Sequence, residues 1–332
     1  MIAPAPVTER DAGSTGRRLP TVSMPDAAAL VPWGILFLLV VVDAILQPST
    51  LTLSNVGAVV FGALPLVFAA AGQTLVVLAG GVDLSIAGVL SLTSALLATQ
   101  ADATTLPLWL FLCSCVGCAV GLGNAICIIW LRMQPFIVTL GTWSIVGGCA
   151  LLVLPSQGGT VPSALSDVGI LIFGGIPLSI IILAVVVLTW LWARRTGPIR
   201  RIYAYGSDRQ SSTLLGVRPA RTLLLTYALA GICAALGGIF YTSQVASGDP
   251  IGGNTYILTS ITAVVIGGAR LSGGRGSLLG TIAGAFVTVY IADVVFGFGL
   301  SSFWTPLIQG LLLISAVLVS AASSYLSKRR IR

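Results

Sequence analysis

Long apolar runs separated by short polar segments make up almost all of the chain after residue 30. The runs are continuous, whereas the strands of a membrane β-barrel would alternate apolar and polar positions. A run of about 20 apolar residues can cross a bilayer as an α-helix. Lipid offers no hydrogen bonds, so each run must satisfy its backbone internally. The pattern therefore predicts an all-α polytopic membrane protein.

About ten membrane segments can be separated. They lie at 31–46, 56–79, 86–98, 107–130, 135–154, 168–192, 222–245, 257–268, 278–298 and 304–325. The runs at 86–98 and 257–268 are short for a full crossing, which suggests broken or re-entrant helices. We expect a disordered cytoplasmic tail at 1–30, a membrane domain at 31–326 and a basic cytoplasmic tail at 327–332.

The positions of the basic residues predict the orientation. With the N-terminus in the cytoplasm, ten crossings place every basic loop inside: Arg132, the segment 193–221, Arg270 with Arg275, and the C-terminal KRRIR. The loops on the opposite side contain no lysine or arginine. Because cytoplasmic loops carry an excess of these residues, both termini are predicted to be cytoplasmic. The net charge of +7 thus indicates membrane topology and not nucleic-acid binding.

The rare residues exclude several classes of chemistry. The chain has no histidine, one lysine (Lys328) and one glutamate (Glu9), both of the latter in the tails. A phosphate-binding P-loop needs a lysine, and histidine-based catalysis needs the imidazole. The six cysteines fall inside apolar runs and have no histidine near them. We therefore predict a chain that is not an enzyme, has no cofactor of its own and holds no metal.

The segment 193–221 is the only long polar interruption, with seven arginines and one acid. Ser207 and Gln210 fit the N-cap and N3 positions of a capping box, and Gly216 fits the position after the helix end. The pattern predicts a helix of about eight residues, which is too short to stand alone in water. We expect it to dock on another protein, although a solvated loop that only sets topology is the alternative. The residues of this candidate coupling site are Ser207, Asp208, Arg209, Gln210, Leu214, Leu215 and Gly216.

Two turns share the pattern Gly-Gly-x-x-Leu-Ser, at Gly80–Ser85 and Gly267–Ser272. Paired glycine-interrupted segments in two halves point to the moving or binding parts of a transporter. An internal duplication explains the pattern, and so do two unrelated tight turns that need glycine. The hinge or turn residues expected from it are Gly80, Gly81, Asp83, Ser85, Gly267, Gly268, Ser272, Gly273 and Gly274.

Acids and polar residues at the apolar runs are functional candidates, because burying them in a membrane is costly. Asp83 can cap the next helix, pair with Arg270 or Arg132, or bind a coupling ion, and Asp293 is the second such acid. Polar residues that can line a transport path are Gln73, Thr74, Asn124, Thr139 and Ser144. The pairs Gly117/Gly121 and Gly280/Gly284 allow close helix packing, within the chain or between subunits.

Four stretches, at 70–92, 134–152, 200–217 and 266–285, resemble the permease subunits of ribose/xylose/galactose-type bacterial ABC importers. The resemblance implies a homo- or heterodimeric permease in the bacterial cytoplasmic (inner) membrane. It also implies a cytoplasmic ABC ATPase that binds ATP and Mg²⁺, and a periplasmic or lipid-anchored sugar-binding protein. The loop after the sixth segment would contain the helix that engages the ATPase.

The function that this resemblance implies is import of a monosaccharide or related polyol by alternating access. One departure is that the coupling helix carries Gln210-Ser211-Ser212 where the family usually has an acid and two alanines. Two alternatives remain open. One is an ABC permease for branched-chain amino acids or nucleosides, and the other is an ion-coupled secondary transporter that uses Asp83 and Asp293.

Overall fold

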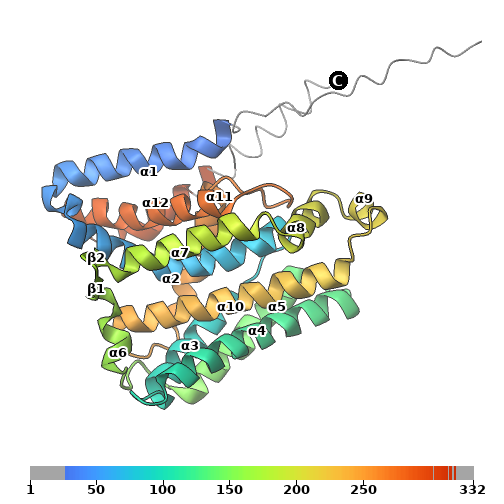
Figure 1. Ribbon diagram of the computed structural model, residues 1–332, viewed down its shortest axis with the longest axis horizontal. Coiled ribbons are helices and arrows are strands. Elements are labelled where there is room, and N and C mark those ends of the chain that lie inside the picture. The colour runs from blue at the N-terminus through green and yellow to red at the C-terminus, as the bar shows by residue number, and fades with distance from the viewer. Residues whose placement is uncertain (1–26, 302, 313, 316–317, 319–332) are drawn as a thin grey trace, which may run out of the picture.

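The computed structural model describes residues 27–301, 303–312, 314–315 and 318. Its long helices lie side by side in one bundle (Figure 1). They are α1 (Ala27–Leu46), α2 (Leu53–Leu78), α3 (Ser85–Gln100), α4 (Leu106–Trp130), α5 (Pro135–Val153), α7 (Leu178–Ala193), α10 (Pro219–Val245), α11 (Thr255–Ile266) and α12 (Leu278–Gly297). Residues 1–26 of the tail predicted at 1–30, and the whole tail predicted at 327–332, lie outside the described residues. Residues 27–30 belong to α1, which begins four residues before the membrane segment predicted at 31–46.

Shorter elements connect these helices. They are α6 (Ser163–Ser166), α8 (Gly197–Ser207), α9 (Arg209–Leu214), the 3₁₀ turns η1 (Pro48–Leu51), η2 (Asp167–Gly169) and η3 (Gly252–Asn254), and the antiparallel strands β1 (Ile172–Phe173) and β2 (Ile176–Pro177). The α-helical polytopic class is thus confirmed, with one small hairpin added.

Within the described residues, five helices are long and apolar enough to cross a membrane: α2, α4, α5, α10 and α12. The number becomes six if α7 and α8, which meet at an angle of 74°, are counted as one broken span. The short helices α3 and α11 agree with the short runs found in the sequence. Ten crossings and cytoplasmic termini stay predictions.

The sixth apolar run differs from its expected form. The sequence predicts one helix over 168–192, but residues 168–177 form the end of η2 and the hairpin of β1 and β2. Gly174 and Gly175 have φ of +59° and +83°, which suits the hairpin turn and not a helix. The helix α7 therefore starts only at Leu178, and its continuation is the bent helix α8.

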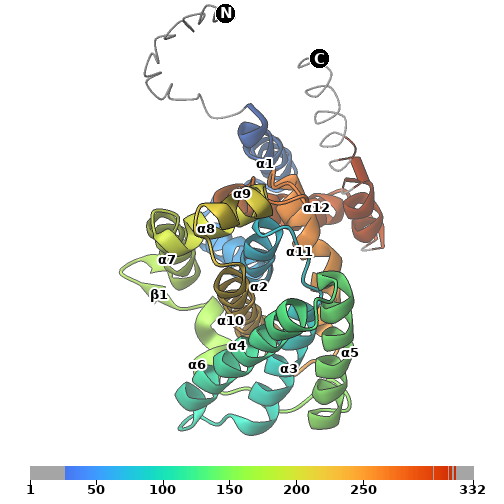
Figure 2. The same ribbon diagram turned by 90° about the vertical axis from the view of Figure 1, so that its right-hand side faces the viewer.

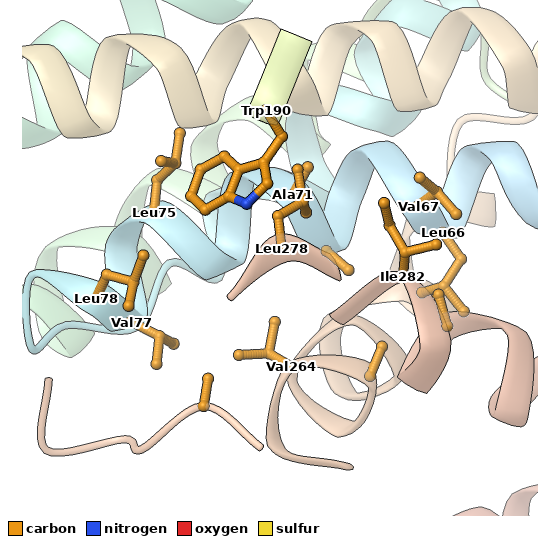
Figure 3. Packing of buried hydrophobic residues seen from close by; sticks show 14 of the residues in the cluster. Leu66, Val67, Ala71, Leu75, Val77, Leu78, Trp190, Val264, Leu278 and Ile282 are labelled. Carbon is orange, nitrogen blue, oxygen red and sulfur yellow. The ribbon is translucent and has the colours of Figure 1, made fainter. Parts of the chain in front are cut away.

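The core of the bundle is built around α2. Of its most apolar window 83% is buried, compared with 28% for α4 and 22% for α5, whose apolar faces point outward. Figure 3 shows Trp190 of α7, Leu75 of α2, Leu278 of α12 and Val264 of α11 meeting in one cluster. Because α2 touches all three neighbours, a shift of α2 must be accommodated by each of them.

Glycines allow two helix pairs to approach closely. A methyl group at Gly117 or Gly121 of α4 would collide with the backbone carbonyls of Gly231 and Tyr227 on α10. Gly280 and Gly284 of α12 face α11 in the same way. Both small-residue pairs thus serve packing within the chain, which is one of the two alternatives that the sequence left open.

The two ends of the bundle differ in character. The helices α8 and α9 lie at one end, and α6 with the β1–β2 hairpin lies at the other (Figure 1). Arg132 and Arg209 line one cavity at the first end, and Arg201, Arg218 and Arg221 line another. We call this end the arginine-rich end.

Candidate functional site

The helix α8 is amphipathic and rests on the bundle. Ile199, Ile202 and Tyr205 are buried on one face, while Arg200 and Arg201 are exposed on the other. Residues three apart share a face of a helix, which accounts for this division. In Figure 2, which looks at the arginine-rich end, α8 and α9 lie over the end of α2. The segment 193–221 is therefore two packed helices and not one extended loop.

The N-cap of α9 is Asp208 and not Ser207. The Asp208 carboxylate accepts hydrogen bonds from the N–H of Gln210 at 2.9 Å and of Ser211 at 3.1 Å, and from the Ser211 hydroxyl at 2.6 Å. The hydroxyl of Ser207 instead donates backward to the Tyr203 carbonyl at 2.8 Å, because Ser207 is the last residue of α8. The predicted capping box is therefore wrong, and α9 has six residues instead of about eight.

The charge of Asp208 suits this role. The hydrogen bonds from Ser211, followed by that from Gln210, hold the pKa of the exposed Asp208 carboxyl below its usual range. A carboxylate also interacts favourably with the positive end of the helix dipole. Asp208 is thus ionised, and capping, throughout the physiological pH range.

The far end of α9 presents two leucines to solvent. Leu214 and Leu215 are 84% and 85% exposed, whereas Ser212 is buried and its hydroxyl donates to the Arg209 carbonyl within α9. Gly216 follows with φ of +86°, as expected for the position after a helix end. Large apolar side chains exposed at the end of a short helix indicate a contact surface for another molecule.

The two glycine turns end their helices in the same way. Gly80 follows α2 with φ of +80°, and Gly268 follows α11 with φ of +84°. The next N–H, of Gly81 or Ala269, then bonds the carbonyl five residues earlier, as in a Schellman motif. Gly80 is thus structurally equivalent to Gly268, whereas the shared sequence pattern aligns Gly80 with Gly267. The turns have the same geometry, while a duplication of the surrounding units stays a prediction.

Both turns meet α8 at one point, which we call the junction. The N–H of Gly274 donates to the carbonyl of Leu78 at 2.9 Å, so the second turn bonds the end of α2. A methyl group at Gly206 of α8 would collide with the same Leu78 carbonyl and lie 2.8 Å from the Gly274 nitrogen. The Tyr203 hydroxyl donates to the Gly276 carbonyl at 2.7 Å. Three chain segments are therefore held together by one backbone hydrogen bond, one hydrogen bond from a tyrosine side chain and close backbone packing at Gly206.

The start of α9 also reaches the junction. The Arg209 guanidinium lies over the Tyr205 ring at 5.4 Å, and a methyl group at Gly80 would lie 3.6 Å from it. The structure thus brings together Ser207, Arg209, Gly80, Gly273 and Gly274 from the residues predicted for coupling and hinge roles. It leaves Leu214 and Leu215 apart from them, at the exposed end.

Sequence reasoning missed three residues of the junction: Gly206, Tyr203 and Leu78. The only signal for Gly206 is a glycine near the end of an amphipathic helix, where it lowers helix propensity unless close packing requires it. No pattern marks Leu78, because its carbonyl makes the contact. Of the glycines predicted as hinge or turn residues, Gly81 and Gly267 lie at helix ends but do not have positive φ.

Asp83 starts a buried hydrogen-bond chain across four segments. Its carboxylate accepts from the N–H and the hydroxyl of Ser85 at 2.9 and 2.6 Å. Asn124 of α4 donates to the Ser85 hydroxyl at 2.8 Å and accepts from Thr142 of α5 at 2.6 Å. Burial of this turn raises the pKa of Asp83 to about 6, which the bonds from Ser85 partly oppose. Asp83 thus binds the first residue of α3 from just before the N-cap position, which is Leu84, and Ser85 links it to the bundle.

Most of the residues predicted to line a path lie inside the bundle. Gln73, Thr74, Asn124 and Thr139 are buried, and only Ser144 is exposed. Thr74 donates to the Thr281 hydroxyl at 2.8 Å. Both polar atoms of the Gln73 amide are buried without a hydrogen-bond partner among the described residues.

The fold and this end of it define a class. The chain is a polytopic α-helical membrane protein that presents a short capped helix from an arginine-rich face and braces it on the ends of its buried helices. No group of histidine, cysteine and acidic residues able to hold a metal occurs within the described ranges.

The chain belongs to the family of ABC importer permeases described as the branched-chain amino acid transport system / permease component, which residues 55–317 match. It is therefore a multi-pass permease subunit of the bacterial inner membrane. It is similar to the ribose import permease protein of Bacillus subtilis, with 34% identity over 87% of this chain and 91% of the relative. It is also similar to the autoinducer 2 import system permease protein of Photorhabdus temperata, with 33% identity over 74% and 76%. No solved structure matches the chain.

Proposed function

We propose that this chain is the transmembrane subunit of an ABC importer that moves a monosaccharide or related polyol into the cytoplasm by alternating access. ATP is hydrolysed in a separate cytoplasmic subunit, and α9 transmits the motion. The observation that carries the proposal is the pair Leu214 and Leu215, exposed on a helix whose other end is fixed to the junction. A periplasmic or lipid-anchored binding protein delivers the substrate, and a second permease copy completes the path.

Sugars are favoured as substrates by the relatives named for ribose import. The family description names branched-chain amino acids, so this class remains the second candidate, with nucleosides beside it. A thermal-shift screen of the binding protein encoded beside this chain separates the classes. Stabilisation by a pentose or hexose supports the proposal, and stabilisation by leucine, a nucleoside or autoinducer 2 contradicts its substrate.

The ion-coupled alternative is less well supported by the geometry. Its first acid, Asp83, has its carboxylate engaged by two hydrogen bonds from Ser85. The buried and unpartnered amide of Gln73 is a better candidate for a polar contact in another conformation of the path. Uptake by vesicles that contain this chain alone and an ion gradient would contradict an ATP-driven importer.

Leu214→Asp tests the role of α9. Burial of a leucine side chain contributes about 1.5–3 kcal/mol, so we expect the exchange to weaken ATPase co-purification by at least about tenfold. Leu214→Met keeps an apolar side chain of similar size and should co-purify like the wild type. Both variants should keep the wild-type thermal midpoint, because Leu214 touches solvent in the permease. Undiminished co-purification of Leu214→Asp would contradict docking through α9.

A further inference from the structure

The proposed docking of α9 on an ATPase does not account for a second cavity at the arginine-rich end. It has a volume of about 420 Å³ and lies between α8, the segment after α9 and the first turns of α10. Arg201, Arg218 and Arg221 line it together with Thr222, and Pro198 and Leu225 provide its apolar wall. These residues come from both sides of α9 in the sequence, so the fold itself brings the three arginines to the lining of one cavity.

The charge of this cavity is unbalanced. Its lining contains no acidic side chain. Asp208, the only acid of the segment 193–221, uses its carboxylate to cap α9. Three guanidinium groups around one cavity repel one another unless an anion enters, and arginine binds phosphate with paired N–H donors. The chemistry of the lining therefore selects a phosphate group.

The position of the cavity indicates where that phosphate comes from. Leu188 and Trp192 of α7 are 63% and 70% exposed, so this side of the helix faces lipid. Tryptophan concentrates at the level of the lipid headgroups, and Pro198 follows Trp192 by six residues. Basic pockets between helices at the cytoplasmic interface suit anionic headgroups. An apolar wall at Leu225 beside the arginines suits a phospholipid better than a free ion.

We propose that this cavity binds the phosphate group of an anionic phospholipid from the cytoplasmic leaflet. One phosphate contacts Arg201 before α9 and both Arg218 and Arg221 after it. The lipid therefore ties together the two chain segments that carry α9. One consequence rests on the proposed function: anionic lipid increases the coupling of ATP hydrolysis to transport. Lipid binding itself does not depend on the proposed function.

The test is binding of phosphatidylglycerol to the purified full-length permease, measured by native mass spectrometry and by lipid-dependent thermal stabilisation. Each arginine near an anionic lipid contributes about fivefold in affinity, so the triple variant Arg201→Gln/Arg218→Gln/Arg221→Gln should bind about 100-fold more weakly. The matched control Arg132→Gln/Arg270→Gln/Arg275→Gln removes the same charge from residues that do not line the cavity, so it should bind within about threefold of the wild type. If the triple variant does not fold in phosphatidylcholine, Arg218→Gln alone should still show the fivefold loss.

Three results would overturn the proposal. An equal loss in the two triple variants would show diffuse attraction of charges without a site. Displacement of the lipid by inorganic phosphate at equal concentration would assign the cavity to a soluble phosphate. No lipid binding to the wild-type permease, combined with loss of ATPase co-purification in the first triple variant, would assign the arginines to acids of the ATPase. None of these measurements depends on the substrate or on transport.

Discussion

Gly206→Ala adds a single methyl group at the junction and thereby tests the junction apart from the rest of the bundle. The added Cβ would meet the Leu78 carbonyl and the Gly274 nitrogen, which are themselves joined by a 2.9 Å hydrogen bond. Overpacking costs about 1–3 kcal/mol, and loss of the hydrogen bond costs a further 0.5–1.5 kcal/mol, roughly. Alanine regains up to about 1 kcal/mol of helix propensity. The net cost is about 2 kcal/mol, and it falls on the contact between α8 and the two turns.

Limited trypsin digestion measures this cost directly. Arg200, Arg201 and Arg209 flank the junction, and cleavage there reports how often the segment detaches. A cost of about 2 kcal/mol raises the detached population about 30-fold, and the cleavage rate with it when opening is fast. In the complete importer, the same variant should hydrolyse ATP with reduced uptake, because α9 then moves without α2.

Gly197→Ala is the matched control. Gly197 begins the same helix, and a methyl group there would have no atom within 4 Å. Its digestion should follow that of the wild type. If Gly206→Ala and Gly197→Ala were cleaved at the same rate, the junction would not hold the segment 193–221 on the bundle, and the reasoning from Gly206 would be refuted.

Two further pairs of variants test single hydrogen bonds. Asp208→Ala should weaken ATPase binding while Asp208→Asn retains most of it, because asparagine is an equally good N-cap; equal effects in co-purification would contradict capping as the role of Asp208. Asp83→Ala leaves the buried Ser85 donors without their acceptor and should cost about 1–3 kcal/mol, seen as a lower thermal midpoint. Asp83→Asn keeps an acceptor oxygen and should lower the midpoint less; a larger loss with asparagine would indicate that the charge itself is needed.

The features that the sequence predicts well depend on local pattern alone. Continuous apolar runs identify the membrane helices, since lipid allows no other structure for them. The exposed pair Leu214 and Leu215 and the positive φ of Gly216 follow from the short polar segment around them. Neither the membrane helices nor the end of α9 requires knowledge of contacts with residues distant in the sequence.

The N-cap of α9 shows where local pattern is insufficient. Ser207 and Asp208 are both good N-cap residues, so the sequence permits either. The choice depends on where α8 ends. That end is set by Tyr203 and Gly206, which contact residues about 70 and 130 positions away. The helix predicted over 168–177 is wrong for a different, local reason, because glycines inside the run favour a hairpin over a helix.

The alignment of the two glycine turns also depends on contacts with residues distant in the sequence. The letters align Gly80 with Gly267, whereas the helix ends align Gly80 with Gly268. A Schellman ending requires positive φ at one position, and the neighbouring glycine serves a different purpose. Gly267 is needed because α12 passes close to it, at Gly280. Glycines at matching sequence positions of the two turns are therefore required by different contacts.

In the proposed function, the junction accounts for how a helix of six residues would transmit force. On its own α9 would not stay folded, but its first turn is fixed by Asp208, Arg209 lies against Tyr205, and α8 is locked on Leu78. Leu78 is the last residue of α2, the most buried of the membrane-crossing helices. A partner that displaces the exposed leucines therefore acts on α2 through α8, and the packed core leaves α2 no small independent movement. Such a displacement would pass to α7, α10, α11 and α12 together, which is the kind of concerted change that the proposed alternating access requires.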